Sequence, residues 1–167
     1  MLKMTKTKRL SYVTMLSALS IVINLFESWF IPPVQFGIRF GLANIISLIT
    51  IELFGIKELL IVNIMRILIG SLLRGIIFGS PFWISFGGIL LSTIIIIILH
   101  KLKTSLLFTS IMSAIFHSLG QVLIVSFIYH QSNVMMILPI LLISSILTGC
   151  LTGFIAKECL KRLKRWR

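Results

Sequence analysis

Residues 82–99 read FWISFGGILLSTIIIIIL, a run in which no side chain carries a charge. A helix of about 20 apolar residues crosses the hydrocarbon core of a bilayer, so this run predicts a transmembrane helix. The rest of the chain has the same character: of 167 residues, 57% are hydrophobic and only 12% are charged. Soluble domains carry about 25% charged residues. The composition therefore excludes a soluble globular protein and predicts an integral membrane protein.

Further apolar runs lie on both sides of this stretch. Pro32-Pro33 and Gly79-Ser80-Pro81 cannot continue a helix and mark loops between the runs. The sequence predicts an all-α, six-helix transmembrane bundle that occupies residues 11–156 as one domain. A basic N-terminus, 1–10, precedes it and a basic amphipathic tail, 157–167, follows it. The expected spans are 11–30, 42–54, 56–73, 82–99, 105–129 and 134–156.

The basic residues predict the orientation of this bundle. With six spans, both termini share one side, and that side collects nearly all of the 16 Lys and Arg residues. Arg39 and Arg74 fall on the opposite side, and Arg66 falls within a span. Positively charged loops stay in the cytoplasm, so both termini are expected to be cytoplasmic. The net charge of +12 then predicts contact with anionic lipid through the C-terminal tail, and no nucleic acid partner.

Ionisable residues inside spans are costly and tend to face a bundle interior or a cavity. Asn63, Arg66, Gly70 and Arg74 recur at helical spacing and share one face of the third expected helix. This face predicts a site for an anionic group. The structural alternatives stay open: Arg66 pairs with Glu27 or Glu52 to tie helices together, and Arg74 reaches the lipid headgroups.

A second polar face lies on the fifth expected helix, where Ser113, His117 and Gln121 are four residues apart. The alternative for His117 is a plain interhelical hydrogen bond. Together with residues near the outer ends of the first and second helices, this face predicts a polar pocket open to the outside. Its Arg-rich lining favours a ligand with phosphate or carboxylate. The candidate ligand-binding residues are Arg66, Arg74, His117, Gln121, Asn44, Asn63, Glu27, Asn24 and Arg39.

The sequence lacks the motifs of several classes of enzyme. All four acidic residues are glutamates, so no Asp-rich metal site exists. No phosphate loop, nucleophile elbow or His-Glu-x-x-His motif occurs, and Cys150 and Cys159 lack metal-ligand spacing. We therefore expect no enzyme activity, no cofactor and no metal. The sequence has no ATP site either, so any energy coupling must come from a partner.

Five motifs occur in order between residues 10 and 163: Gly41-Leu-Ala-Asn-Ile45, Arg66-x-x-x-Gly70-Ser-Leu-Leu-x-Gly75, Ser85-x-Gly-Gly-x-x-x-Ser92, His117-x-x-Gly-Gln121 and Thr148-Gly-x-x-Thr-Gly153. Together they resemble the bacterial membrane family called heptaprenyl diphosphate synthase component I, or Gx transporter family. Members resemble the substrate-binding S components of energy-coupling factor (ECF) transporters. The resemblance implies a multi-pass protein of the bacterial plasma membrane.

In such transporters the S component captures a solute outside the cell and docks on a transmembrane coupling protein with two ATPases. The docking surface uses Ala-x-x-x-Ala on the first helix, for which this chain offers Thr14 and Ala18. The resemblance thus implies capture of a small anionic solute. Arg66 and Arg74 would hold the anion, Asn44, His117 and Gln121 would orient it, and the loop 31–40 would close over it.

A second hypothesis follows from the family's name: a subunit associated with heptaprenyl diphosphate synthase in isoprenoid or menaquinone biosynthesis. Long-chain prenyl diphosphate synthases need Asp-rich motifs to hold magnesium. A chain without aspartate would be a non-catalytic membrane partner, with a diphosphate or prenyl tail at the face of Arg66 and Arg74.

Overall fold

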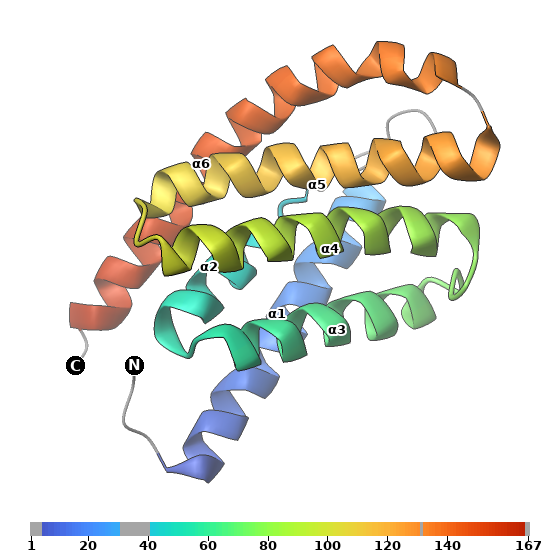
Figure 1. Ribbon diagram of the computed structural model, residues 1–167. Coiled ribbons are helices and arrows are strands. Elements are labelled where there is room, and N and C mark those ends of the chain that lie inside the picture. The colour runs from blue at the N-terminus through green and yellow to red at the C-terminus, as the bar shows by residue number, and fades with distance from the viewer. Residues whose placement is uncertain (1–4, 31–40, 131, 166–167) are drawn as a thin grey trace.

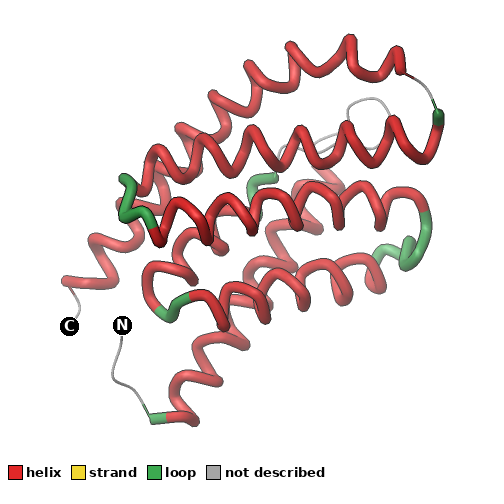
Figure 2. Tube along the Cα trace, in the orientation of Figure 1, coloured by secondary structure: helices red, strands yellow, loops and turns green. Residues whose placement is uncertain are grey.

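The computed structural model describes residues 5–30, 41–130 and 132–165. In these ranges the chain is all-helical, without strands, which confirms the all-α class (Figures 1 and 2). A short 3₁₀ helix, η2, at Ser132–Ile137 precedes the last of six α-helices. The α-helices are α1 (Lys6–Phe30), α2 (Asn44–Leu53), α3 (Ile56–Leu73), α4 (Ser80–Lys101), α5 (Leu106–Tyr129) and α6 (Leu138–Arg165).

The helix ends follow from local sequence. Gly55, with a φ of 103°, makes the turn between α2 and α3. Pro81 lies in the first turn of α4, where its missing N–H leaves no hydrogen bond unmade. Ser105 caps α5 by accepting a hydrogen bond from the backbone N–H of Phe108 at 3.3 Å. These turns join antiparallel neighbours closely.

Four helices are long and apolar enough to cross a membrane: the candidate spans are Lys6–Trp29, Ser80–Lys101, Leu106–Ile128 and Met135–Leu163. Many large apolar side chains on these helices are exposed, among them Phe127 at 76% and Leu147 at 68%. An exposed apolar surface of this size is unfavourable in water and favourable in contact with lipid chains. The protein is therefore a multi-pass membrane protein. The remaining helices are the ten-residue α2 and α3, which carries Lys57, Glu58 and Arg66.

Helices α3 to α6 run alternately in opposite directions, with α1 and α2 behind them (Figure 1). Helix α2 is buried over most of its length, and its Leu48 and Ile51 form a core cluster with Leu59, Ile96 and Leu160. Helix α1 begins and α6 ends at the same end of the bundle (Figure 1). This end is called the terminal end below.

Two helices extend beyond their expected limits. Helix α1 begins at Lys6 instead of residue 11, so much of the basic N-terminus is helical. Helix α6 continues without a break through the boundary expected at residue 156 and ends at Arg165. Leu160, within the expected tail, is 6% exposed and packs against α2. The first part of the tail is thus the last part of α6, and its contact with anionic lipid stays a prediction.

Candidate functional site

A small cavity lies between α1, α3, α4, α5 and the residues just before α2. Its volume of about 10 Å³ is that of about one water molecule. As the described residues enclose it, the cavity therefore has no room for a larger solute. The cavity is lined by Asn24, Glu27, Gly41, Ala43, Arg66, Ser85, Ile89, His117 and Gln121. Five of these, Asn24, Glu27, Arg66, His117 and Gln121, are residues that the sequence singled out for ligand binding.

Arg66 is the cation of the cavity. Its side chain is only 2% exposed, and among the described residues its Nε and Nη2 atoms have no hydrogen-bond partner. Glu27 is the charged group that acts on the guanidinium electrostatically. A buried charge with open hydrogen-bonding positions is costly in a membrane protein, which makes Arg66 the leading functional candidate.

Glu27 holds the backbone that leads into α2. One carboxylate oxygen accepts a hydrogen bond from the N–H of Gly41 at 2.6 Å, and the other accepts from Leu42 at 3.2 Å. Gly41 has a φ of +78°, a conformation that favours glycine. A Cβ atom there would also lie 3.0 Å from Cδ2 of His117. Glycine is thus needed both for the turn and for the approach to the histidine.

His117 and Gln121 share one face of α5 and are 6% and 1% exposed. Gly88 of α4 provides the space for both. A Cβ on Gly88 would lie 2.8 Å from Cγ of Gln121 and 3.0 Å from Cε1 of His117. Both side chains therefore depend on the close approach of α4 to α5. The sequence motif Ser85-x-Gly-Gly carried this signal, but neither Ser85 nor Gly41 was assigned as a ligand contact from sequence.

Two of the predicted binding residues take part in interhelical hydrogen bonds outside the cavity lining. The Nδ2 atom of Asn44 donates to Oγ of Ser113 at 2.8 Å, which joins α2 to α5. Asn63 accepts from Oγ of Ser47 at 2.7 Å and donates to Oγ1 of Thr93 at 2.8 Å. Asn63 thereby joins α3 to α2 and α4.

Arg74 also lies outside the cavity lining. Its Nε donates to the carbonyl of Gly70 at 2.8 Å, and its Nη1 donates to Oγ of Ser28 at 3.2 Å. Arg74 thus joins the end of α3 to the end of α1. Arg39 and the loop 31–40, expected to close over the site, lie outside the described residues.

The predicted docking residues Thr14 and Ala18 are exposed on α1. Thr14 Oγ1 donates to the carbonyl of Leu10 at 3.0 Å, within its own helix. The exposed position leaves this face free for a partner, and docking there stays a prediction.

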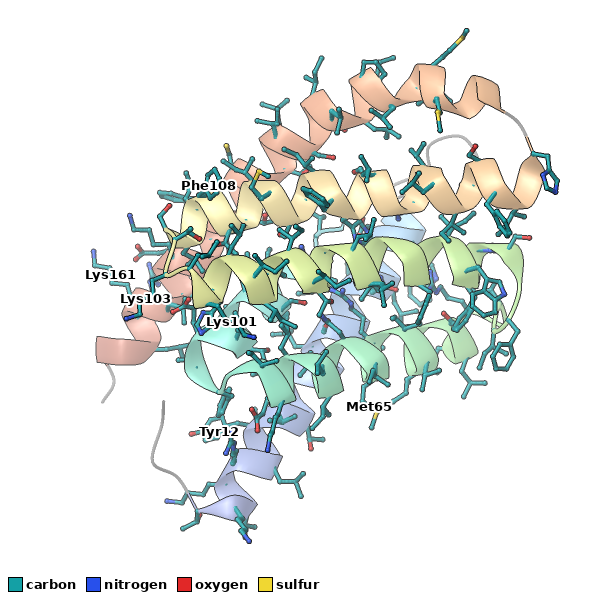
Figure 3. All side chains as sticks on the ribbon, in the orientation of Figure 1. Tyr12, Met65, Lys101, Lys103, Phe108 and Lys161 are labelled. Carbon is teal, nitrogen blue, oxygen red and sulfur yellow. The ribbon has the colours of Figure 1, made fainter. Side chains whose placement is uncertain are left out.

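A larger, open groove lies at the terminal end of the bundle. Its volume is about 530 Å³, and it is lined by Glu52, His100, Lys101, Lys103 and Thr104. His100 Nδ1 is 3.3 Å from Oε1 of Glu52. Figure 3 shows the side chains of Lys101 and Lys103 at this end. In 5–30, 41–130 and 132–165, no three His, Cys or acidic residues are placed to hold a metal ion.

The fold and the cavity define a class: an all-helical, multi-pass membrane protein with an ionic cavity enclosed between its helices. A family model described as heptaprenyl diphosphate synthase component I matches residues 16–159. The chain therefore belongs to the heptaprenyl diphosphate synthase component I family, and the match contains every residue that lines the cavity. Comparisons with curated proteins and with solved structures found no match.

Proposed function

We propose that this protein is the substrate-binding, S-component-like subunit of a transporter. It captures a small anionic solute from the extracellular side, and partner subunits with ATPase activity drive uptake. The observation that carries the proposal concerns Arg66: it lines the cavity, and its Nε and Nη2 have no hydrogen-bond partner among the described residues.

A purely structural arginine would use these N–H groups to join helices. Asn63 and Arg74 do so, since each bonds to a neighbouring helix. Leaving a buried donor without a partner costs about 1–3 kcal/mol, and more for a charged group. A ligand that supplies two acceptors to Arg66 recovers this free energy, which favours binding over a role in packing.

The depth of the cavity supports capture from outside. Asn24 and Glu27 lie in the last part of α1, far from the terminal end where α1 begins. With both termini in the cytoplasm, as the distribution of basic residues indicates, the cavity lies in the outer half of the membrane. Since the closed cavity has room for about one water, the helices around it must separate to admit a solute.

The chain itself supplies no ATP site and no Asp-rich metal site, so we propose a binding subunit and no enzyme. Energy coupling falls to a transmembrane coupling protein with ATPases, and the exposed face of α1 around Thr14 and Ala18 is the proposed contact.

A cell-based comparison tests the proposal. Cells lacking the gene would be supplied with the wild-type protein, Arg66→Gln, or the surface control Arg162→Gln. The solutes removed from the medium and the long-chain prenyl quinones in the membrane would both be quantified. We expect Arg66→Gln to leave one solute in the medium and the quinones unchanged, while Arg162→Gln behaves as wild type. Loss of quinone with intact uptake would overturn the proposal.

The second candidate is a non-catalytic membrane subunit of a prenyl diphosphate synthase. The family match favours it, and so does the basic groove at the terminal end, where Lys101 and Lys103 offer charges to a diphosphate or an acidic partner. In the same assay this function predicts that the paired change Lys101→Gln and Lys103→Gln lowers the quinone and leaves solute uptake unchanged. Unchanged quinone in the paired variant would contradict it.

A further inference from the structure

The two open positions of Arg66 are neighbours on its guanidinium group. The Nε–H and the adjacent Nη2–H lie on the same edge and point in parallel directions, so they match the two oxygens of a carboxylate. We infer that the ligand presents a single carboxylate to this edge of Arg66. The inference rests on the proposed function, because it specifies the solute that the cavity takes.

The hydrogen bonds of Glu27 keep this edge open. One of its oxygens accepts from Gly41 and the other from Leu42. Glu27 therefore offsets the charge of Arg66 from a position where it does not occupy Nε or Nη2. An incoming carboxylate would meet a guanidinium whose bidentate edge has no partner in 5–30, 41–130 and 132–165.

The charge balance of the cavity favours a ligand with one negative charge. The lining contains one arginine and one glutamate, with His117 beside them. A phosphate monoester carries about −1.5 to −2 at neutral pH, and a diphosphate carries more. Each added negative charge would face Glu27 in a buried site, and among the described residues Arg66 is the one arginine of the lining, because Arg74 lies outside it.

The size of the cavity points the same way. A planar carboxylate is smaller than a tetrahedral phosphate. The helices α1, α3, α4 and α5 would therefore have to move apart less to admit it. Ser85 and Gln121, which both line the cavity, are further polar side chains available to its oxygens. The remaining part of the solute would meet Ala43 and Ile89.

The test uses the full-length protein in nanodiscs and follows its unfolding by tryptophan fluorescence. The probes are acetate, butyrate, inorganic phosphate and inorganic diphosphate at equal ionic strength, with chloride as the reference. For each probe, the increase in Tm of Arg66→Gln is subtracted from that of the wild type. This difference removes any contribution from the lysines of the terminal groove, because both proteins contain them. We expect such an increase with acetate and butyrate and none with phosphate or diphosphate.

Arg66→Lys separates the shape of the guanidinium from its charge. Lysine keeps the charge but lacks the parallel pair of donors, so we expect carboxylate affinity to fall by about tenfold or more. The matched control Arg162→Lys, on the exposed part of α6, leaves the affinity unchanged. Equal carboxylate affinity in Arg66→Lys and wild type would overturn the inference.

Two further outcomes separate this inference from the proposed function. If only phosphate or diphosphate raises the Tm in a way that depends on Arg66, the inference of a carboxylate ligand is wrong, but the cavity is still an anion-binding site. The absence of an Arg66-dependent increase with every probe also overturns the inference. The uptake comparison then decides the proposed function by itself, because that comparison requires no assumption about the anion.

Discussion

Arg66 and Glu27 are the charged residues of the cavity, and they differ in their hydrogen-bond partners. Glu27 uses both oxygens on the backbone before α2, whereas Arg66 keeps two N–H groups without partners in the described part of the chain. The pair therefore acts on both the fold and the site. Glu27 positions Gly41 beside His117, and Arg66 lines the cavity.

Glu27→Gln should lower stability strongly. The change removes the charge that offsets the buried Arg66 and weakens the hold on the Gly41 and Leu42 backbone, and breaking one side of such a pair costs about 3–5 kcal/mol. Equilibrium unfolding in mixed detergent micelles measures the loss. The double variant Glu27→Gln with Arg66→Gln should lose less than the sum of the single variants. Strict additivity would show that the two charges do not interact.

Asn63→Ala should affect stability and not ligand binding. Asn63 joins α2, α3 and α4 through Ser47 and Thr93, so its removal takes the acceptor from the buried Ser47 hydroxyl and costs about 1–3 kcal/mol, while Thr93 keeps its bond to the Ile89 carbonyl. Unfolding in detergent measures the stability, and native mass spectrometry of retained small molecules measures the ligand binding. A variant as stable as the wild type that has lost its ligand would contradict this account.

Residue spacing predicted the centre of the site but not its edges. Helical periodicity predicted that Asn63, Arg66 and Arg74 share one face of α3, and in the structure all three face neighbouring helices. Their separate roles depend on what lies opposite: Thr93 for Asn63, the cavity for Arg66 and Ser28 for Arg74. A single sequence does not specify which helix faces another. Gly41 and Ser85 escaped assignment because small residues carry little chemical signal.

At the scale of the helices, the contact between α4 and α5 controls the shape of the cavity. A Cβ added to Gly120 would collide with the carbonyl oxygen of Gly87 and lie 2.8 Å from its carbonyl carbon. The two backbones therefore approach directly, as small residues allow in membrane helices. Gly88, one residue further along α4, then brings the same close approach to His117 and Gln121.

Gly120→Ala should force α4 and α5 apart. The added methyl group meets backbone atoms that cannot rotate away, so we expect a loss of about 1–3 kcal/mol or more. The matched control is Gly70→Ala on α3, whose Cβ would have only an ordinary contact of 3.4 Å with Oδ1 of Asn24. Thermal unfolding of both variants in the same detergent makes the comparison. Equal Tm values for the two would contradict the direct contact of α4 and α5.

The positions of most helices followed from the sequence. The apolar runs and the glycine and proline breaks predicted α2 to α5 to within a few residues, because in a membrane protein these features reflect solvation by lipid. The start of α1 and the end of α6 did not follow from hydropathy. Both ends are charged helices: Arg9 of α1 forms an ion pair of 2.6 Å with Glu58, and Leu160 of α6 packs on α2.

Over the whole molecule, charge and topology agree. The start of α1, the end of α6 and the groove with Lys101 and Lys103 lie at the terminal end (Figures 1 and 3). Arg66, the cation of the cavity, is enclosed within the bundle. If the terminal end is retained in the cytoplasm, as the positive-inside rule predicts for this distribution, the cavity lies in the outer half of the membrane.

Cysteine labelling tests this orientation. In a background with Cys150→Ser and Cys159→Ser, one cysteine would replace Ile77, in the turn between α3 and α4, and in a separate variant Lys101, at the terminal end. Both positions are exposed. A membrane-impermeant maleimide added to intact cells should label Ile77→Cys, and should label Lys101→Cys only after permeabilisation. The reverse pattern would place the cavity in the inner half of the membrane.

The central claim is that the cavity around Arg66 binds a small anionic solute, and native mass spectrometry of the protein released from its own membranes tests it most directly. Wild type, Arg66→Gln and the surface control Arg162→Gln would be compared. We predict a retained water-soluble anion in the wild type and in Arg162→Gln, and its absence from Arg66→Gln. A polyprenyl mass or a bound synthase subunit that Arg66→Gln leaves unchanged, with no small anion, would contradict the account.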